Sequence, residues 1–298
     1  MQCQRGRYRP SLNIKINYLY TMIRPILLLL CSVLLCNSVF SQDSTRQKVY
    51  NIKVKYELPA ATAFLIGSSF AFKALDGVSS FKASDVINLD PRSVNWFDRP
   101  IIDMDPTKFA ESHKRSNNFL NISVLSPIVL ALDKNIRHDW LDLISLYLVA
   151  HAVDNTVYFA AAFPVRRARP LTYNQDIPVN ERIGRAKSNS FFSGHVSFST
   201  TATFFAVKVY TDYHQIKGLK RILLYGAASV PPAMVGYYRM KAGRHFKTDV
   251  MLGYLVGASS GILVPEMHRN KGKNTDKRVS LEPFYNPEYT GVTMKVPL

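Results

Sequence analysis

The sequence predicts an all-α fold: a bundle of about six helices, embedded in a membrane, with short strand-like segments toward its N- and C-terminal ends. Two observations support this prediction. The 298 residues are 47% hydrophobic and 20% charged, which is enough apolar material for one large core. Six apolar stretches also recur along the chain, and several are close to the ~20 residues with which a helix crosses a bilayer.

The first element, residues 22–41, has the pattern of a secretory signal. Arg24 supplies the positive start, residues 26–35 form an apolar centre, and small residues up to Ser41 provide a cleavage site. We therefore expect residues 1–41 to be a removed leader, with translation starting at Met22. An uncleaved membrane anchor is the alternative interpretation.

Cysteine and charge restrict the chemistry. Cys3, Cys31 and Cys36 all precede the expected cleavage site, so the mature chain would have no thiol catalyst, disulfide or cysteine-bound metal. The net charge is +17, and about +12 remains after the leader, with 33 basic and 21 acidic residues. This excess favours anionic partners such as lipid headgroups or phosphorylated substrates, and an exported apolar chain makes nucleic acid the weakest candidate.

After the leader we expect a short extension (42–58), a helical domain (59–265) and a polar tail (266–298). Residues 50–58 alternate apolar and polar side chains, which predicts a strand. We expect a second strand near the C-terminus, in the segment that ends at residue 298, to pair with it. Residues 76–117 read as a long polar connection. The predicted helices are 59–75, 118–133, 139–163, 196–210, 219–237 and 249–265. Pro231 and Pro232 should kink the fifth of them.

Three polar stretches lie where these helices begin or end. In an up-and-down bundle, the end of the third helix, the start of the fourth, the end of the fifth and the start of the sixth share one face. Chain order alone therefore predicts a cluster of five residues at one end of the bundle: Arg169, His195, Arg239, His245 and Asp249.

The spacing of His245 and Asp249 suggests a nucleophile. Positions i and i+4 are neighbours on a helix, so Asp249 is expected to accept a hydrogen bond from one ring nitrogen of His245 and to leave the other nitrogen's lone pair free. Half of a zinc site is the rival interpretation, but no HExxH motif or dense histidine and carboxylate cluster supplies further ligands. We expect no metal and no organic cofactor.

The other two stretches suggest anion binding. Ser193, Gly194 and His195 open a predicted helix, where unpaired backbone N–H groups and the helix dipole attract an anion. The alternative interpretation of Ser193 is an N-cap. Arg169 and Arg239 offer planar forks that match phosphate oxygens. We expect His151 and Asp154 to form a polar pair inside the bundle, and the remaining histidines, His113 among them, to be solvated.

Together, Arg169-Pro170, Ser193-Gly194-His195 and Arg239-x5-His245-x3-Asp249 resemble the three signature motifs of the type 2 phosphatidic acid phosphatase (PAP2) superfamily. This superfamily also includes bacterial nonspecific acid phosphatases and vanadium haloperoxidases. The resemblance covers roughly residues 118–265, and the motifs occur in the family's order. It implies a PAP2-type bundle in which His245 forms a phosphohistidine, Asp249 orients it and His195 protonates the leaving oxygen. It also implies that Arg169, Arg239 and the backbone at Ser193 and Gly194 hold the phosphoryl oxygens.

The chain departs from the family's first motif. A lysine is expected seven residues before Arg169, and Ala162 stands there. Arg166 lies three residues before Arg169, on the same face of a helix, and is the candidate replacement, ahead of Arg167.

The expected function is therefore hydrolysis of a lipid phosphate or diphosphate. The candidate substrates that the resemblance implies are phosphatidate, phosphatidylglycerophosphate, isoprenyl diphosphates and lipid A phosphates. A vanadate-dependent haloperoxidase and a non-catalytic lipid-phosphate-binding protein are the alternatives. We expect a location in a bacterial inner membrane, no obligate protein partner, and a site facing the periplasm. If residues 59–75 span the membrane, an exported Gln42 instead places the site on the cytoplasmic side.

Overall fold

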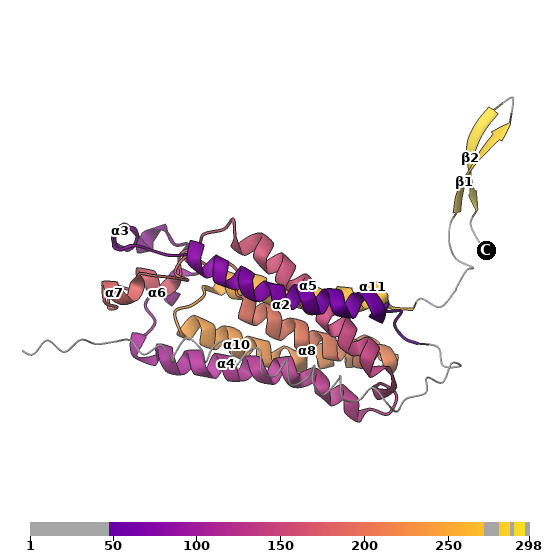
Figure 1. Ribbon diagram of the computed structural model, residues 1–298, viewed down its shortest axis with the longest axis horizontal. Coiled ribbons are helices and arrows are strands. Elements are labelled where there is room, and N and C mark those ends of the chain that lie inside the picture. The colour runs from indigo at the N-terminus through magenta and orange to yellow at the C-terminus, as the bar shows by residue number, and fades with distance from the viewer. Residues whose placement is uncertain (1–47, 271–279, 287–288, 296–298) are drawn as a thin grey trace, which may run out of the picture. The chain divides into compact units, whose positions relative to one another are not determined.

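The structure is a computed structural model that describes residues 48–270, 280–286 and 289–295. The leader predicted for residues 1–41 lies outside the described residues. The order of elements is shown in Figure 1.

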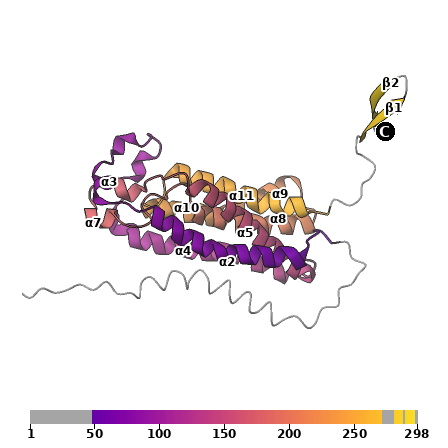
Figure 2. The same ribbon diagram turned by 45° about the horizontal axis from the view of Figure 1, so that its top comes forward.

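Long helices form the body of the protein, and two views show them running side by side (Figures 1 and 2). The all-α prediction is confirmed for this part of the chain. The helices of the bundle are α2 (Val54–Val78), α4 (Phe109–Leu125), α5 (Trp140–Ala162), α8 (Gly194–Tyr213), α9 (Gly218–Ala228), α10 (Val230–Lys241) and α11 (Lys247–His268).

Short elements connect them. Within residues 48–270 these are brief α-helices, α3 (Ala83–Ile87), α6 (Pro170–Tyr173) and α7 (Val179–Arg182), and 3₁₀ turns, η1 (Pro91–Ser93), η2 (Arg99–Ile101), η3 (Pro106–Lys108), η4 (Ser126–Leu132) and η5 (Arg137–Asp139). In both views α3 and α7 lie at one end of the bundle, which is also where α5 ends and where α8 and α11 begin. We call this the site end.

The strand predicted over residues 50–58 is wrong. Only Tyr50 forms a β-bridge, to Arg269, and α2 begins at Val54. The alternation is short and runs without a turn residue into a long apolar helix. Glu57 in the first turn of that helix accepts a hydrogen bond from the backbone N–H of Lys53 at 3.0 Å, which supplies a partner to a donor at the helix start.

The C-terminal prediction is partly correct. Strands form there, but β1 (Ser280–Asn286) pairs antiparallel with β2 (Tyr289–Lys295) and not with residues 50–58. The long polar connection is also shorter than predicted, because α4 already begins at Phe109. Pro231 and Pro232 have the predicted effect, since the fifth helix divides at Ser229 into α9 and α10.

Helix α8 is central, with contacts to α4, α5, α10 and α11. Its closest approach is to α11, where Gly253, Gly257 and Gly261 lie four residues apart and hence on one face. A Cβ atom at Gly253 would lie 2.6 Å from the carbonyl oxygen of Ser193, and one at Gly261 equally close to that of Thr201. Small residues thus let two backbones meet, and this contact sets the start of α8 beside the start of α11.

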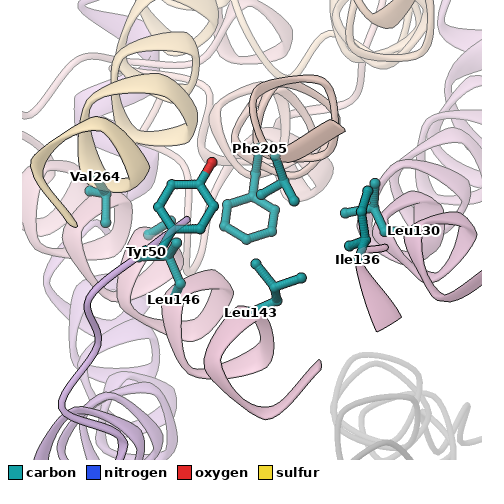
Figure 3. Close-up of a cluster of buried hydrophobic side chains, with 9 residues drawn as sticks. Tyr50, Leu130, Ile136, Leu143, Leu146, Phe205 and Val264 are labelled. Atoms are coloured by element: carbon teal, nitrogen blue, oxygen red, sulfur yellow. The ribbon is translucent and has the colours of Figure 1, made fainter. Parts of the chain in front are cut away.

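The opposite end of the bundle has its own core. Tyr50, Leu146, Phe205 and Val264 belong to one buried cluster there (Figure 3). The hydroxyl of Tyr50 donates to Asp212 at 2.9 Å. Asp212 also pairs with Lys208, which is 1% exposed and contacts Glu266 at 2.6 Å. Residues 48–50 are therefore fixed at the end farthest from the site end.

Among the described residues, three helices are long and apolar enough to cross a membrane: α2, the stretch Arg137–Ala162 that contains α5, and α11. Large apolar side chains on them face outward, including Phe70, which is 68% exposed, and Leu255, which is 60% exposed. Exposed apolar area of this kind marks a surface that contacts lipid or protein. The chain is accordingly a membrane protein.

We predict that the glycine contact is essential for stability. Gly257→Ala would push a methyl group against Thr200 Cβ at 2.8 Å and against the carbonyl of Ser197, so it should lower the free energy of unfolding by about 1–3 kcal/mol. Gly67→Ala is the matched control, because a Cβ atom there meets no atom within 4 Å, and it should stabilise α2 by up to about 1 kcal/mol. Denaturant titration of detergent-solubilised protein measures both changes. Equal effects at the two positions would show that α8 and α11 are not in close contact.

Candidate active site

The structure brings the predicted residues to the site end. Arg169 precedes α6, His195 is in the first turn of α8, Arg239 is in the last turn of α10, and His245 directly precedes the N-cap of α11. The charges of Arg169 and Arg239 act on both histidines, and His245 acts on His195. These four side chains therefore share one electrostatic environment.

His245 is held through one ring nitrogen. It is 3% exposed, and its Nδ1–H donates to the backbone carbonyl of Ser190 at 2.7 Å. A carbonyl oxygen only accepts, so the proton is on Nδ1 and the lone pair is on Nε2. The ring therefore presents a nucleophilic nitrogen.

The predicted hydrogen bond from His245 to Asp249 is replaced by the one to Ser190. The prediction placed both residues on one helical face, but α11 begins at Lys247, so His245 lies outside the helix. Asp249 instead accepts from the hydroxyl of Ser190 at 2.6 Å and from the backbone N–H of Phe246 at 2.9 Å. Asp249 consequently acts on His245 only through the segment that contains Ser190.

Arg167 completes the surroundings of Asp249. Its guanidinium donates to Asp249 at 2.6 Å and to Asp98 at 2.7 Å. Both carboxylates are fully buried, with side chains 0% exposed. Asp98 also accepts from the hydroxyl of Thr248 at 2.6 Å. Burial would raise the pKa of Asp98, but the hydrogen bonds from Thr248 and Arg167 lower it below its ordinary value.

Arg166 does not take this position. It is exposed and donates back to the carbonyl of Phe163 at 2.7 Å. The chain after α5 is no longer helical at this point, so the helical spacing that selected Arg166 over Arg167 does not apply. Asp98 was not predicted as a site residue because it lies in the polar connection, residues 76–117, which has the pattern of a surface loop.

Arg169 is fixed in a buried polar chain. Its Nε donates to Asn189 at 2.8 Å, and Asn189 donates to Asp76 of α2 at 3.2 Å. Burial, reinforced by the nearby charge of Arg244, lowers the pKa of Arg169 to about 10. The guanidinium remains charged at neutral pH.

Arg239 contacts a histidine that we expected to be solvated. It is 4% exposed, and its NH1 donates to Nδ1 of His113 on α4 at 2.8 Å. His113 is half-buried between α4 and α10, so the solvated interpretation is wrong. Its position in a polar stretch hid it, because α4 begins nine residues before the predicted helix.

The start of α8 has the features of an anion site. Ser193 occupies the N-cap position, but its side chain makes no capping hydrogen bond, and its buried hydroxyl has no hydrogen-bond partner in the described part of the chain. The backbone N–H of Ser193 donates to the carbonyl of Asp249 at 3.0 Å. The N–H groups that follow, at Gly194 and His195, begin a helix and have no intrahelical acceptor.

Burial and the surrounding arginines favour the neutral form of both histidines. Burial lowers the pKa of His245 well below its ordinary value, and the positive charges of Arg169 and Arg239 lower it further. Burial and the charge of Arg239 have the same effect on the pKa of His195. A bound anion would offset the arginines and raise both values.

Arg244 adds a cation that the motif pattern did not single out. It directly precedes His245, and its backbone N–H donates to the carbonyl of Arg239 at 3.1 Å. Its charge acts on His245, His113 and Arg169.

The expected pair of His151 and Asp154 does not form. Asp154 accepts from the hydroxyl of Ser197, and neither ring nitrogen of His151 has a partner within the described residues. His151 packs instead against Tyr147 and Phe198. His151 and Asp154 are three residues apart on α5, but their side chains contact different neighbours.

Part of the chain matches a known protein family. Residues 143–273 of the chain match the model of the PAP2 superfamily. No curated protein matches the chain.

Two solved structures are similar to the chain. One is the crystal structure of Aquifex aeolicus LpxE, 18% identical with a TM-score of 0.38, covering 56% of this chain and 92% of that one. The other is a transmembrane PAP2 type phosphatidylglycerolphosphate phosphatase from Bacillus subtilis, 17% identical with a TM-score of 0.38, covering 74% of this chain and 99% of that one.

The two adjacent arginines should behave differently. Arg167→Met leaves Asp98 and Asp249 buried without their cation, so we predict a loss of about 3–5 kcal/mol in the free energy of unfolding. Arg166→Met removes an exposed side chain and should change it by less than about 0.5 kcal/mol. Denaturant titration compares them directly. Equal stability of the two variants would contradict the buried ion pairs.

Proposed function

We propose that the protein is a phosphatase that hydrolyses a lipid phosphate or diphosphate through a phosphohistidine on His245. The observation that carries the proposal is the hydrogen bond from Nδ1 of His245 to the carbonyl of Ser190. It leaves Nε2 as a neutral nucleophile among Arg169, Arg239 and Arg244, whose charges act on that ring. A nucleophile surrounded by cations suits attack on an anionic phosphoryl group.

In the first step, the lone pair on Nε2 of His245 attacks phosphorus, and the bond from phosphorus to the leaving oxygen breaks. His195 donates a proton to that oxygen. Arg169, Arg239 and the N–H groups at the start of α8 hold the other phosphoryl oxygens, which carry most of the charge. Arg244 is the candidate for the cation that the missing motif lysine would have supplied.

In the second step, His195 takes a proton from water, and the resulting oxygen attacks the phosphoryl group. The bond from nitrogen to phosphorus breaks, phosphate leaves, and His245 returns to its neutral form. Every step uses groups of this chain and water. Ser190 keeps the same ring nitrogen occupied throughout.

The outward apolar faces of α2, α5 and α11 support a lipid as the substrate. A site at the end of these helices lies where a headgroup would meet the edge of a bilayer, while the acyl or isoprenyl chains stay in the apolar phase. The inner membrane of a bacterium is the location that we propose.

The first test replaces the nucleophile. His245→Asn keeps a donor near the position of Nδ1 but has no atom at Nε2, so phosphate release from phosphatidate in detergent should fall by more than about 10³-fold. Binding of inorganic phosphate, measured by calorimetry, should persist because the arginines remain. Release at the wild-type rate would exclude His245 as the nucleophile.

The pH dependence tests His195 as the acid. His195 must carry a proton for the first step, and the bound phosphoryl group should raise its pKa above that of the empty site. The alkaline fall of kcat, which reports the complex, should therefore occur at higher pH than that of kcat/KM, which reports the free protein. Stopped assays between about pH 5 and 9 measure both, a range that includes the ordinary histidine value. This role would be contradicted if kcat and kcat/KM fell at the same alkaline pH. It would also be contradicted if His195→Asn kept the alkaline fall of the wild type.

The side of the membrane that the site faces is also testable. We propose the periplasm, which places Tyr50, at the opposite end, on the cytoplasmic side. This orientation requires that the segment before Tyr50 is not exported. If α2 crosses the membrane and Gln42 is exported, the site is cytoplasmic instead. Gln175→Cys marks the site end and Lys217→Cys the opposite end, and both positions are exposed. In intact cells, an impermeant thiol reagent should label Gln175→Cys only, and labelling of Lys217→Cys only would reverse the orientation.

A further inference from the structure

One contact of the site involves a helix that carries none of the three motifs. His113 lies on α4, and Nδ1 of its ring is 2.8 Å from NH1 of Arg239 on α10. A guanidinium only donates, so the ring accepts through Nδ1 and carries its proton on Nε2. His113 is therefore a neutral imidazole bound to a phosphate-binding arginine.

The surroundings make this contact well defined. Arg239 is 4% exposed, and its carbonyl is fixed by the backbone N–H of Arg244. α4 packs directly on α10, and the ring of Phe119 on α4 stacks on that of Tyr238, at 5.8 Å between centroids. The two helices therefore hold the imidazole and the guanidinium in a fixed relation.

We propose that His113 is a positioning residue for Arg239, holding the plane of its guanidinium so that the fork meets the phosphoryl oxygens. This inference rests on the proposed function, because the fork matters only where a phosphoryl group binds. Arginine recognises phosphate through two parallel N–H groups, and small errors in orientation are costly in such sites.

His113 does this without exchanging a proton. Burial and the charges of Arg239, Arg244 and Arg169 lower the pKa of His113 to about 3. The charged or titratable groups that face it are these arginines, from α10, the loop before α11 and the segment before α6, together with His195 from α8. Protonation would remove the acceptor and add a like charge beside Arg239, and the neutral ring avoids both.

The experiment compares two substitutions of His113, one without a hydrogen-bond acceptor for Arg239 and one that keeps an acceptor. His113→Leu removes the acceptor, and a hydrogen bond to a charged group corresponds to roughly a 10–100-fold effect, so kcat/KM for phosphatidate should fall by about that factor. His113→Asn places a carbonyl oxygen near the position of Nδ1 and should stay within about 3-fold of the wild type. His138→Leu, an exposed histidine in η5, is the matched control and should not change the rate.

Three further readouts separate positioning from a purely structural or an acid–base role. In an Arg239→Ala background, His113→Leu should cost nothing more, because its partner is gone. The pH profile of His113→Asn should match that of the wild type. The dissociation constant for inorganic phosphate should rise in His113→Leu by a factor similar to the loss in kcat/KM.

The outcomes decide between the two proposals. Wild-type kinetics and phosphate affinity in His113→Leu, an equal loss in His113→Asn, or full additivity with Arg239→Ala would each overturn the positioning role while leaving the phosphatase intact. A wild-type protein that binds phosphate but hydrolyses no lipid phosphate would contradict the proposed function, and the binding measurements would still test His113. A protein that neither binds nor hydrolyses would contradict both.

Discussion

The arrangement of the site depends on the contacts of one buried residue, Asp249. Its carboxylate accepts from Ser190, Phe246 and Arg167, and its backbone carbonyl accepts from Ser193. These contacts join the start of α11, the start of α8 and the segment between them. The carbonyl of Ser190 is thereby placed where it fixes the ring of His245. Losing any one hydrogen-bond partner of a buried carboxylate lowers the stability of the folded protein. The contacts of Asp249 therefore depend on one another.

The arginines around Asp249 and His245 fall into two groups. Arg167 is paired with Asp98 and Asp249, and it contributes to the scaffold. Arg169, Arg239 and Arg244 act on the two histidines and lower their pKa values. Three guanidiniums close together repel one another, and an anion bound among them relieves that repulsion. An anion with several oxygens, such as the phosphoryl group of the proposed substrate, would offset these charges.

Chain order and apolar patterning were sufficient to predict the helical class and the end of the bundle at which Arg169, His195, Arg239 and His245 meet. Both follow from local sequence, because apolar stretches bury themselves and short connections join neighbouring helix ends. The partners within the site were not predictable in the same way. Asp98, Asn189 and His113 come from segments that read as loops or solvated stretches, and only packing places them. The predicted contact of His245 with Asp249 failed because the i, i+4 spacing brings side chains together only inside a helix, and α11 begins at Lys247, after His245.

The central claim is that Ser190 holds Nδ1 of His245 and leaves Nε2 to react. The most direct measurement is the position of the phosphoryl group in protein quenched during turnover, determined by mass spectrometry and by NMR of the isolated phosphopeptide. The proposed mechanism predicts phosphorylation of His245 on Nε2. Phosphate on Nδ1 of that ring, on another residue, or on none under conditions of rapid turnover would contradict the account.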